Sequence, residues 1–466
     1  MKYCAFDMER KAMMQKTLPI NSIISKAMQE ITDTGISGFQ NEERAEKIAS
    51  FNGIDVYKIT ADKFKTTSIN LFFLDNLCRE NVTMNALVPA ILRRGCRQFK
   101  SFKDIALRLE ELYGAGFDCG VSKKGERHII QFYMEFISDI FTMEETSLFE
   151  NIFDLLFEIV NEPELENGAF KEDFLTQEKE NLRKLIESRM NDKMQYGVER
   201  CFEEMCKDEP YGLYEYGYVE DLQNISSIKL YEHYQGMLGN YPLKVYLTGD
   251  IDNKKIDMVI KKLSSIKRNQ VKGLNCCNVE KKVDTVKNIT EKMNVTQGKL
   301  TLGFRTNTVP GSEDYYTLIV FNGILGGGIH SKLFQNVREK ASLAYYTYSR
   351  LDRFKGLMVI SGGIDIKNRD KAQEIMLEQI EEIKKGNISD YEYESTMKTI
   401  ETGIKSLMDS QMQIVDYYLS QAVSETGDSF AAMAEKVKKV TRQDVINISS
   451  KIKLDTVYFL TGDGEA

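Results

Sequence analysis

The sequence predicts an α+β fold made of two homologous halves, each an antiparallel or mixed sheet with helices packed on one face, which together enclose a cleft. Three observations lead to this fold class. At 466 residues the chain is too long for one ordinary hydrophobic core. A short strand that ends in Thr-Gly-Asp occurs twice, as KVYLTGDID from Lys244 and as TVYFLTGDG from Thr456. The same order of expected strands and helices precedes each copy.

The spacing of apolar residues predicts the elements of each half. Strict alternation indicates strands, and apolar residues three or four positions apart indicate helices. The first half reads as two strands, an apolar helix, an amphipathic helix and two more strands: IDVYKIT, TSINLFFL, NALVPAILRRG, SFKDIALRLEELYGAG, FDCGVS and HIIQFYMEFI. The second half repeats this order in KLTLGFRT, DYYTLIVFNGILGGG, SKLFQNVREK, AYYTYSRL and GLMVISGGID. Long charged helices follow in both halves.

These elements divide the chain into four segments. We expect an N-terminal extension at 1–40, the N-terminal half at 41–265 and the C-terminal half at 296–466. The polar, lysine-rich residues 266–295 between the halves are typical of a linker.

Composition excludes several classes of function. The net charge of −8 argues against a general nucleic-acid binder, because such binding needs a basic face. No apolar run approaches the 18 residues of a membrane span, and the N-terminus lacks the apolar core of a secretory signal. The eight cysteines form no Cys-x-x-Cys framework and are interpreted as reduced thiols. We therefore expect a cytoplasmic protein without nucleic-acid or membrane partners.

Three glycines, Gly326, Gly327 and Gly328, precede an expected helix, an arrangement that often binds phosphate. The phosphate loop requires Gly-x-x-x-x-Gly-Lys-Ser/Thr, which the following residues do not supply. A dinucleotide fingerprint fails as well, because these glycines follow an apolar run that reads as a helix rather than a strand. Phosphate binding is therefore the weaker interpretation of this turn.

The duplicated α+β unit, the glycine-rich turn, Ser-x-Leu-Phe and Val-Arg-Glu-Lys followed by Leu-Ala-Tyr resemble the pitrilysin/insulinase family of processing peptidases, over roughly residues 45–466. The resemblance implies halves like those of insulinase and the mitochondrial processing peptidase. Catalytic members carry His-x-x-Glu-His on the first apolar helix, where the histidines bind zinc and the glutamate takes a proton from the metal-bound water. Counting back from Gly95, this chain has Ala86, Pro89 and Ala90 at those positions. The resemblance therefore implies a subunit without a zinc site and without a cofactor of its own.

Other residue types that bind zinc do not restore a site. Glu178 and Glu180 could correspond to the family's third ligand, but by themselves they are typical of a solvated charged face. The three histidines, His128, His233 and His330, are scattered along the chain.

Arg338 and Tyr345 match a pair that family members use, in the C-terminal half, to bind the substrate backbone and stabilise the reacting carbonyl. Seven residues on one helix would place both side chains on the same face, about 10 Å apart along the axis. Arginine offers a fork of donors and tyrosine one more. The alternative is structural: Arg338 pairs with a neighbouring carboxylate and Tyr345 packs into the sheet.

A chain with this pair but without zinc resembles the non-catalytic subunit of heterodimeric bacterial family members. Within them, the run NALVPAILRRGCR and the YGAGFD that follows resemble a group associated with 5-aminopentanol modification of elongation factor P. The predicted function is a peptide-binding subunit inactive alone, whose partner is a homologous zinc-bearing chain. The alternatives are a stand-alone peptide-binding or scaffold protein and, with least support, a hydrolase with an unrecognised site. A homodimer in the absence of the partner is equally compatible with the sequence.

Overall fold

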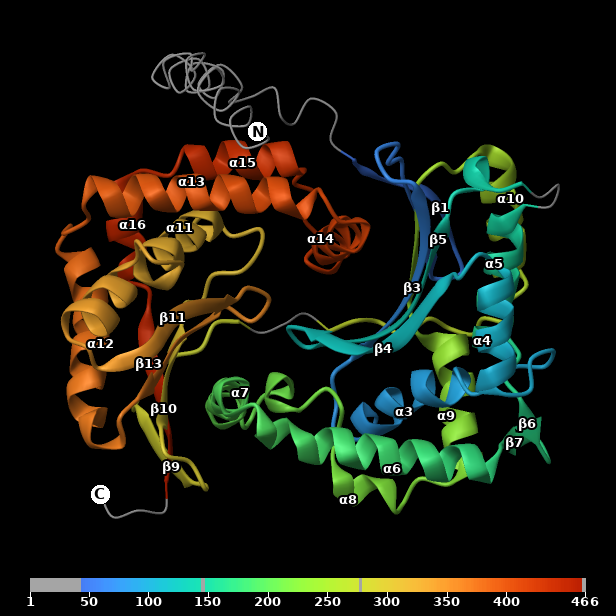
Figure 1. Cartoon of the computed structure of the whole chain (residues 1–466), viewed down its shortest axis with the longest axis horizontal. Helices are drawn as coiled ribbons and strands as arrows, with labels where there is room; N and C mark the ends of the chain where they lie inside the picture. Colours follow the sequence, from blue (N-terminus) through green and yellow to red (C-terminus); the bar gives the residue numbers. More distant parts are fainter. Residues whose placement is uncertain (1–42, 144–146, 276–278, 463–466) are drawn as a thin grey trace, which may run out of the picture. The chain divides into compact units, whose positions relative to one another are not determined.

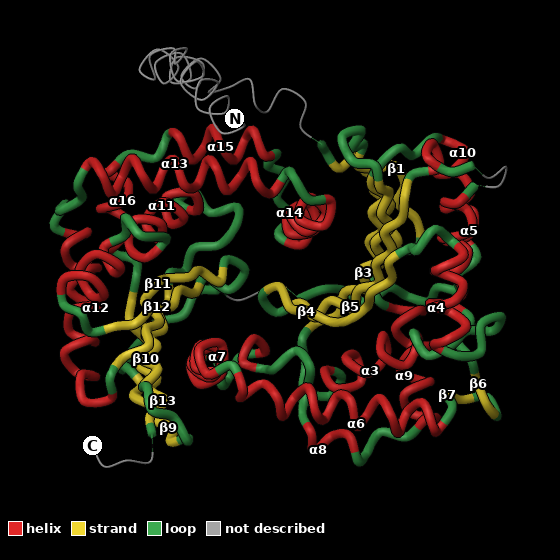
Figure 2. Tube along the Cα trace, viewed as in Figure 1, coloured by secondary structure: helices red, strands yellow, loops and turns green. Residues whose placement is uncertain are grey.

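The computed structural model describes residues 43–143, 147–275 and 279–462. The expected N-terminal extension, 1–40, lies outside them. Figure 1 shows the two sheets with their helices, and Figure 2 shows the same trace by secondary structure. Within the described residues no helix is both long and apolar enough to cross a membrane.

The first half carries a six-stranded sheet in the order β1-β2-β8-β3-β5-β4. Several of its helices begin at Ser101, Ser147 or Ser226, whose side chains accept a hydrogen bond from a first-turn amide. Its elements are β1 (Ala45–Phe51), β2 (Ile54–Ile59), β3 (Thr66–Asn76), α3 (Val82–Leu92), α4 (Phe102–Glu111), β4 (Gly116–Lys124), β5 (Arg127–Ile137), α5 (Leu148–Asn161), β6 (Leu165–Glu166), β7 (Ala169–Phe170), α6 (Glu172–Ser188), α7 (Lys193–Met205), α8 (Val219–Leu222), α9 (Ser227–Asn240), β8 (Leu243–Thr248) and α10 (Asn253–Ser264), with 3-10 helices at Asp139–Phe141, Arg189–Asn191 and Pro210–Gly212.

The second half carries a five-stranded sheet in the order β11-β12-β10-β13-β9. Two of its helices begin with a capping box, at Ser389 and at Thr441. Its elements are β9 (Lys287–Lys292), β10 (Gly298–Arg305), α11 (Tyr315–Gly326), a π-helix (Phe334–Lys340), β11 (Ala344–Asp352), β12 (Leu357–Ile364), a 3-10 helix (Ile366–Asn368), α12 (Arg369–Lys384), α13 (Asp390–Leu407), α14 (Gln411–Val423), α15 (Phe430–Lys438), α16 (Arg442–Ser449) and β13 (Lys453–Thr461).

The two sheets repeat one topology. The order β2-β8-β3-β5-β4 corresponds strand for strand to β9-β13-β10-β12-β11. The pairs β2–β8 and β9–β13 are both parallel, and every other pair in the two orders is antiparallel. The repeated Thr-Gly-Asp strands are the corresponding strands β8 and β13. The predicted α+β fold of two homologous halves is therefore confirmed, and β9, within the range 266–295 expected as a linker, joins the second sheet.

Each sheet has one face covered by helices of its own half. Along β3, Ile69, Leu71 and Phe73 pack into a core with α3, α5 and α9, while Asn70 and Phe72 point to the opposite face. In the second half the corresponding core joins β10, β12 and β13 to α11, α12 and α16. Side chains on the opposite faces are thus left for contacts between the halves.

Each half also sends one helix onto the sheet of the other half. Helix α7 packs against β10, β12 and β13, where Val198 and Phe202 contact Leu357 and Val359. Helix α14 lies against β8, and Gln411 at its start donates a hydrogen bond of 2.6 Å to the carbonyl oxygen of Thr66. The halves are therefore held by exchanged helices rather than by a single flat contact.

A buried ionic cluster adds to this exchange. Glu209, in the first half, binds Arg305 of β10 at 2.6 Å and Lys355 of the β11–β12 turn at 2.8 Å. Both cations are almost fully buried, and Lys355 also pairs with Glu126. We call Glu209, Arg305, Lys355 and Glu126 the interhalf cluster.

Candidate functional site

Helix α3 carries Ala86, Pro89 and Ala90, the residues that the family resemblance matches to the zinc motif. Ala86 and Pro89 are buried in the first core, and Ala90 is partly buried. None of these side chains has an atom that can bind a metal, and nowhere in the described residues do three His, Cys, Asp or Glu side chains gather as a metal site. The residues present do not fit zinc.

Glu178 of α6 is not on a solvated face, so that prediction was wrong for this residue. Helix α6 packs on α3, which buries Leu175, Glu178 and Leu182 along one side of α6. Arg94 donates a hydrogen bond from Nε to Glu178, and Asn181 donates a second at 3.2 Å. An arginine thus neutralises the carboxylate that was compared with a zinc ligand.

Glu180, on the same helix, is half exposed as expected of a charged face. Its carboxylate accepts hydrogen bonds from Arg183 at 2.8 and 3.0 Å, and Lys184 lies 3.3 Å away. These cations lower the pKa of Glu180 to about 2.

Two of the three histidines lie close together beside α3. The sequence did not predict this arrangement. Asn85 lies 3.1 Å from Nδ1 of His128 and 2.8 Å from Nε2 of His233, and its amide also accepts from Tyr241. Burial lowers the pKa of each histidine to about 4, although the nearby Asp75 carboxylate opposes this effect. Both imidazoles are therefore neutral near pH 7. Their meeting depends on the β3–β5 register and on the position of α9, neither of which leaves a local signal.

Arg338 lies in the π-helix Phe334–Lys340, a wider helix than an α-helix. Its guanidinium lies over the Phe334 ring, 4.7 Å from the centroid, and 3.7 Å from the carboxylate of Glu339. The side chain is 44% exposed. Both contacts are local and on the surface, so the remaining donors of the guanidinium face solvent.

Tyr345 lies in strand β11, so the prediction that it shares a helix face with Arg338 was wrong. The helix ends at Lys340, and Ser342 has the left-handed backbone conformation, with φ of 52°. Tyr345 then stands at a bulge, because the pairing of β11 with β12 shifts between Ala344 and Tyr346. The Tyr345 side chain is 69% exposed and does not pack into the sheet.

The glycine-rich turn brings α11 against β11. A Cβ atom added to Gly326 would lie 2.3 Å from the amide nitrogen of Ser349 and 2.6 Å from its hydroxyl. Gly327 caps α11, and its Cβ would meet the backbone of Gly323 at 2.7 Å. The first two glycines of the turn therefore serve close packing in the element before the π-helix.

The chain is similar in sequence and in structure to known proteins. A family model described as the peptidase M16 inactive domain matches residues 224–400. The chain is 35% identical over 410 residues to the probable inactive metalloprotease YmfF of Bacillus subtilis, a match that covers 88% of this chain and 96% of that protein. It is 29% identical over 171 residues to the uncharacterized zinc protease YmxG of the same bacterium, 36% of this chain and 39% of that protein. The crystal structure of a conserved protein from Enterococcus faecalis superposes with a TM-score of 0.84 at 28% identity, over 91% of this chain and 100% of that chain. This chain therefore belongs to the peptidase M16 family, the pitrilysin/insulinase peptidases.

Proposed function

We propose that this chain is a non-catalytic, peptide-binding subunit of a heterodimeric metallopeptidase, in which Arg338 and Tyr345 contact the substrate. A homologous partner chain supplies the zinc. The proposal is carried by one observation: both side chains are exposed at irregular backbone, a π-helix and a β-bulge. Such irregularities recur beside active sites, where they aim a side chain at a ligand.

The chemistry of the pair suits an extended peptide. The guanidinium of Arg338 can donate two parallel hydrogen bonds to carbonyl or carboxylate oxygens, and the hydroxyl of Tyr345 can donate a third. Near a reacting carbonyl, such donors stabilise the negative charge that develops on its oxygen. Because the Arg338–Glu339 contact is on the surface, a peptide can displace it at little cost.

A partner is proposed because Ala86, Pro89 and Ala90 of α3 offer no metal ligand. Two relatives of this chain, the probable inactive metalloprotease YmfF and the uncharacterized zinc protease YmxG, occur in the same bacterium. One chain with substrate donors and one with zinc would complement each other. The alternative is a stand-alone peptide-binding or scaffold protein, and a zinc-bearing homologue encoded beside this gene would favour the heterodimer.

Co-expression with such a homologue tests the partnership. Size-exclusion chromatography should give one complex near twice the monomer mass, containing both chains. Two independently eluting chains at micromolar concentration would contradict the heterodimer. A homodimer that persists when the homologue is present would contradict it as well and favour the stand-alone alternative.

Substitution in the assembled complex tests the pair. Arg338→Ala should lower kcat/KM by roughly 10- to 150-fold, as expected for loss of a charge-assisted hydrogen bond of about 1.5–3 kcal/mol. Tyr345→Phe removes one hydroxyl and should cost less. The matched control is Arg350→Ala, which removes another exposed arginine of the same region, on β11. If Arg338→Ala matched the control in turnover, or lowered stability while turnover was unchanged, Arg338 would be structural.

A further inference from the structure

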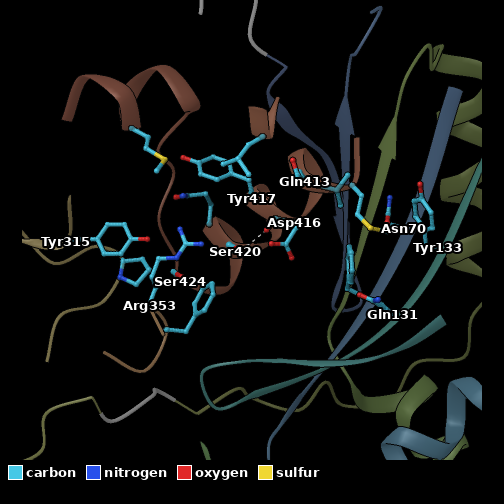
Figure 3. Close-up of a pocket in the computed structure, with 18 of the residues that line it drawn as sticks. Asn70, Gln131, Tyr133, Tyr315, Arg353, Gln413, Asp416, Tyr417, Ser420 and Ser424 are labelled. Atoms are coloured by element: carbon cyan, nitrogen blue, oxygen red, sulfur yellow. Dashed lines mark hydrogen bonds between the residues drawn. The ribbon is translucent and has the colours of Figure 1, made fainter. Parts of the chain in front are cut away.

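A cavity of about 410 Å³ lies between the first sheet and helix α14, away from Arg338 and Tyr345, neither of which lines it. Figure 3 shows Asn70, Gln131 and Tyr133 of β3 and β5 on one side and Tyr315 and Arg353 on the other. The volume falls within the 300–1,000 Å³ typical of small-molecule sites. The cavity is large enough for an amino-acid residue with an aromatic side chain.

The walls of the cavity are mainly apolar. Phe72, Tyr315, Phe354 and Tyr417 contribute rings, and Val415 contributes an aliphatic group from α14. Phe72 and Gln131 are paired across β3 and β5, so an amide group lies beside an aromatic one on the same face. Rings next to a few polar groups favour a ligand with an apolar body and one polar end.

The charges at the cavity do not balance. Asp416 accepts a hydrogen bond of 2.6 Å from Lys124, whose ammonium also lies 5.3 Å from the centre of the Phe354 ring. Arg353, from the β11–β12 turn, is exposed, and within residues 43–143, 147–275 and 279–462 no carboxylate pairs with it. The surplus charge is therefore the guanidinium of Arg353, a group suited to bidentate binding of a carboxylate.

We propose that this cavity binds an apolar carboxylate, with an aromatic or aliphatic group among the rings and its carboxylate on Arg353. The chemistry fits the C-terminal residue of a peptide and equally a free N-acylated amino acid. This site does not depend on the function proposed for Arg338 and Tyr345.

The absence of tryptophan from the chain makes a direct assay available. N-acetyltryptophan can be titrated by its own fluorescence, with N-acetyltryptophanamide as the neutral probe of the same shape. We expect the acid to bind at least 10-fold more tightly than the amide, since the amide cannot form the charged pair. Arg353→Ala should lower the affinity for the acid by about 10-fold or more and leave the affinity for the amide unchanged. Arg350→Ala should change neither affinity.

A second variant tests the apolar part of the site independently of the charge. Ser420→Leu, on the partly exposed helix α14, places a larger side chain in the cavity and should weaken the binding of both probes. The peptide N-acetyl-Gly-Gly-Trp distinguishes the sources: tighter binding than N-acetyltryptophan indicates a peptide C-terminus, and equal binding indicates a free acid. Equal affinities for acid and amide, or an Arg353→Ala variant with unchanged affinity for the acid, would overturn the proposal. So would the lack of any saturable binding at millimolar concentration.

Discussion

Replacing Glu209 by glutamine tests the interhalf cluster. The Glu209 side chain is 7% exposed and accepts hydrogen bonds from Arg305 through both carboxylate oxygens, at 2.6 and 3.2 Å. It also holds Lys355, which is fully buried. Glu209→Gln keeps the shape but removes the charge that these two buried cations share.

The pKa of Glu209 gives the magnitude. Burial alone would raise this pKa, but hydrogen bonds from Arg305 and Lys355 outweigh it and lower the pKa from 4.5 to about 2. At 1.36 kcal/mol per pKa unit, the folded protein favours the carboxylate over the neutral acid by about 3 kcal/mol. Glutamine resembles the neutral acid, so we expect a loss of about 3 kcal/mol, in the range measured when one partner of a buried ion pair is removed.

Urea unfolding at pH 7 and at low pH measures this loss. Because the folded pKa is lowered, the stabilisation by Glu209 is complete above pH 4.5 and disappears as the pH falls towards 2. The difference between parent and Glu209→Gln should therefore shrink in acid. Glu187→Gln, which breaks an exposed i,i+4 pair with Arg183, is the control and should cost less than about 0.5 kcal/mol. A Glu209→Gln protein as stable as this control at pH 7 would refute the reasoning.

Three other outcomes are expected. Gly326→Ala should destabilise the fold by about 1–3 kcal/mol in thermal or urea unfolding, because the added Cβ would lie 2.3 Å from a backbone atom. The control is Gly403→Ala in helix α13, where a Cβ has open space, and it should stabilise the fold by about 0.5–1 kcal/mol. Equal effects of the two substitutions would contradict the packing role of Gly326. The neutral forms of His128 and His233 stabilise the fold fully above about pH 6.5 and lose that effect as the pH falls towards 4. At pH 5 each histidine should therefore lower the free energy of unfolding by about 2 kcal/mol relative to neutral pH. His233→Gln should flatten this part of the pH–stability curve, and an unchanged curve would exclude the role of His233. Elemental analysis of the purified chain should find well below one zinc per molecule, and a chelator should leave the thermal midpoint unchanged; one zinc per chain would contradict the metal-free assignment.

The strands and helices that follow a simple period were predictable from the sequence. The repeats KVYLTGDID and TVYFLTGDG mark β8 and β13 because both strands are buried and bounded by turn residues. The strand β9, KNITEK, was hidden in the expected linker because its exposed, polar residues resemble a loop. Only its pairing with β13, far along the chain, makes it a strand.

The site was predicted less completely than the fold. Tyr345 was predicted on a helix because the residues REKASLAYY give no signal of the left-handed backbone at Ser342 or of the bulge at Tyr345. Glu178 was interpreted as solvated because helical spacing does not tell which face of α6 meets α3 or that Arg94 lies there. The surroundings of Tyr345 and Glu178 thus depend on local backbone geometry and long-range partners, which residue types alone do not indicate.

The exchange of α7 and α14 means that the covalent connection is not what keeps the halves together. A protease that cuts among the exposed residues 284–286 would leave α7 bound to the second sheet and α14 bound to the first. Pulling the fragments apart would expose apolar side chains such as Phe202 and Val359 and would separate Glu209 from Arg305 and Lys355. If the gene were divided at this point, the two polypeptides should therefore assemble as one protein. In the intact chain, the linker only limits the distance between the two halves before they assemble.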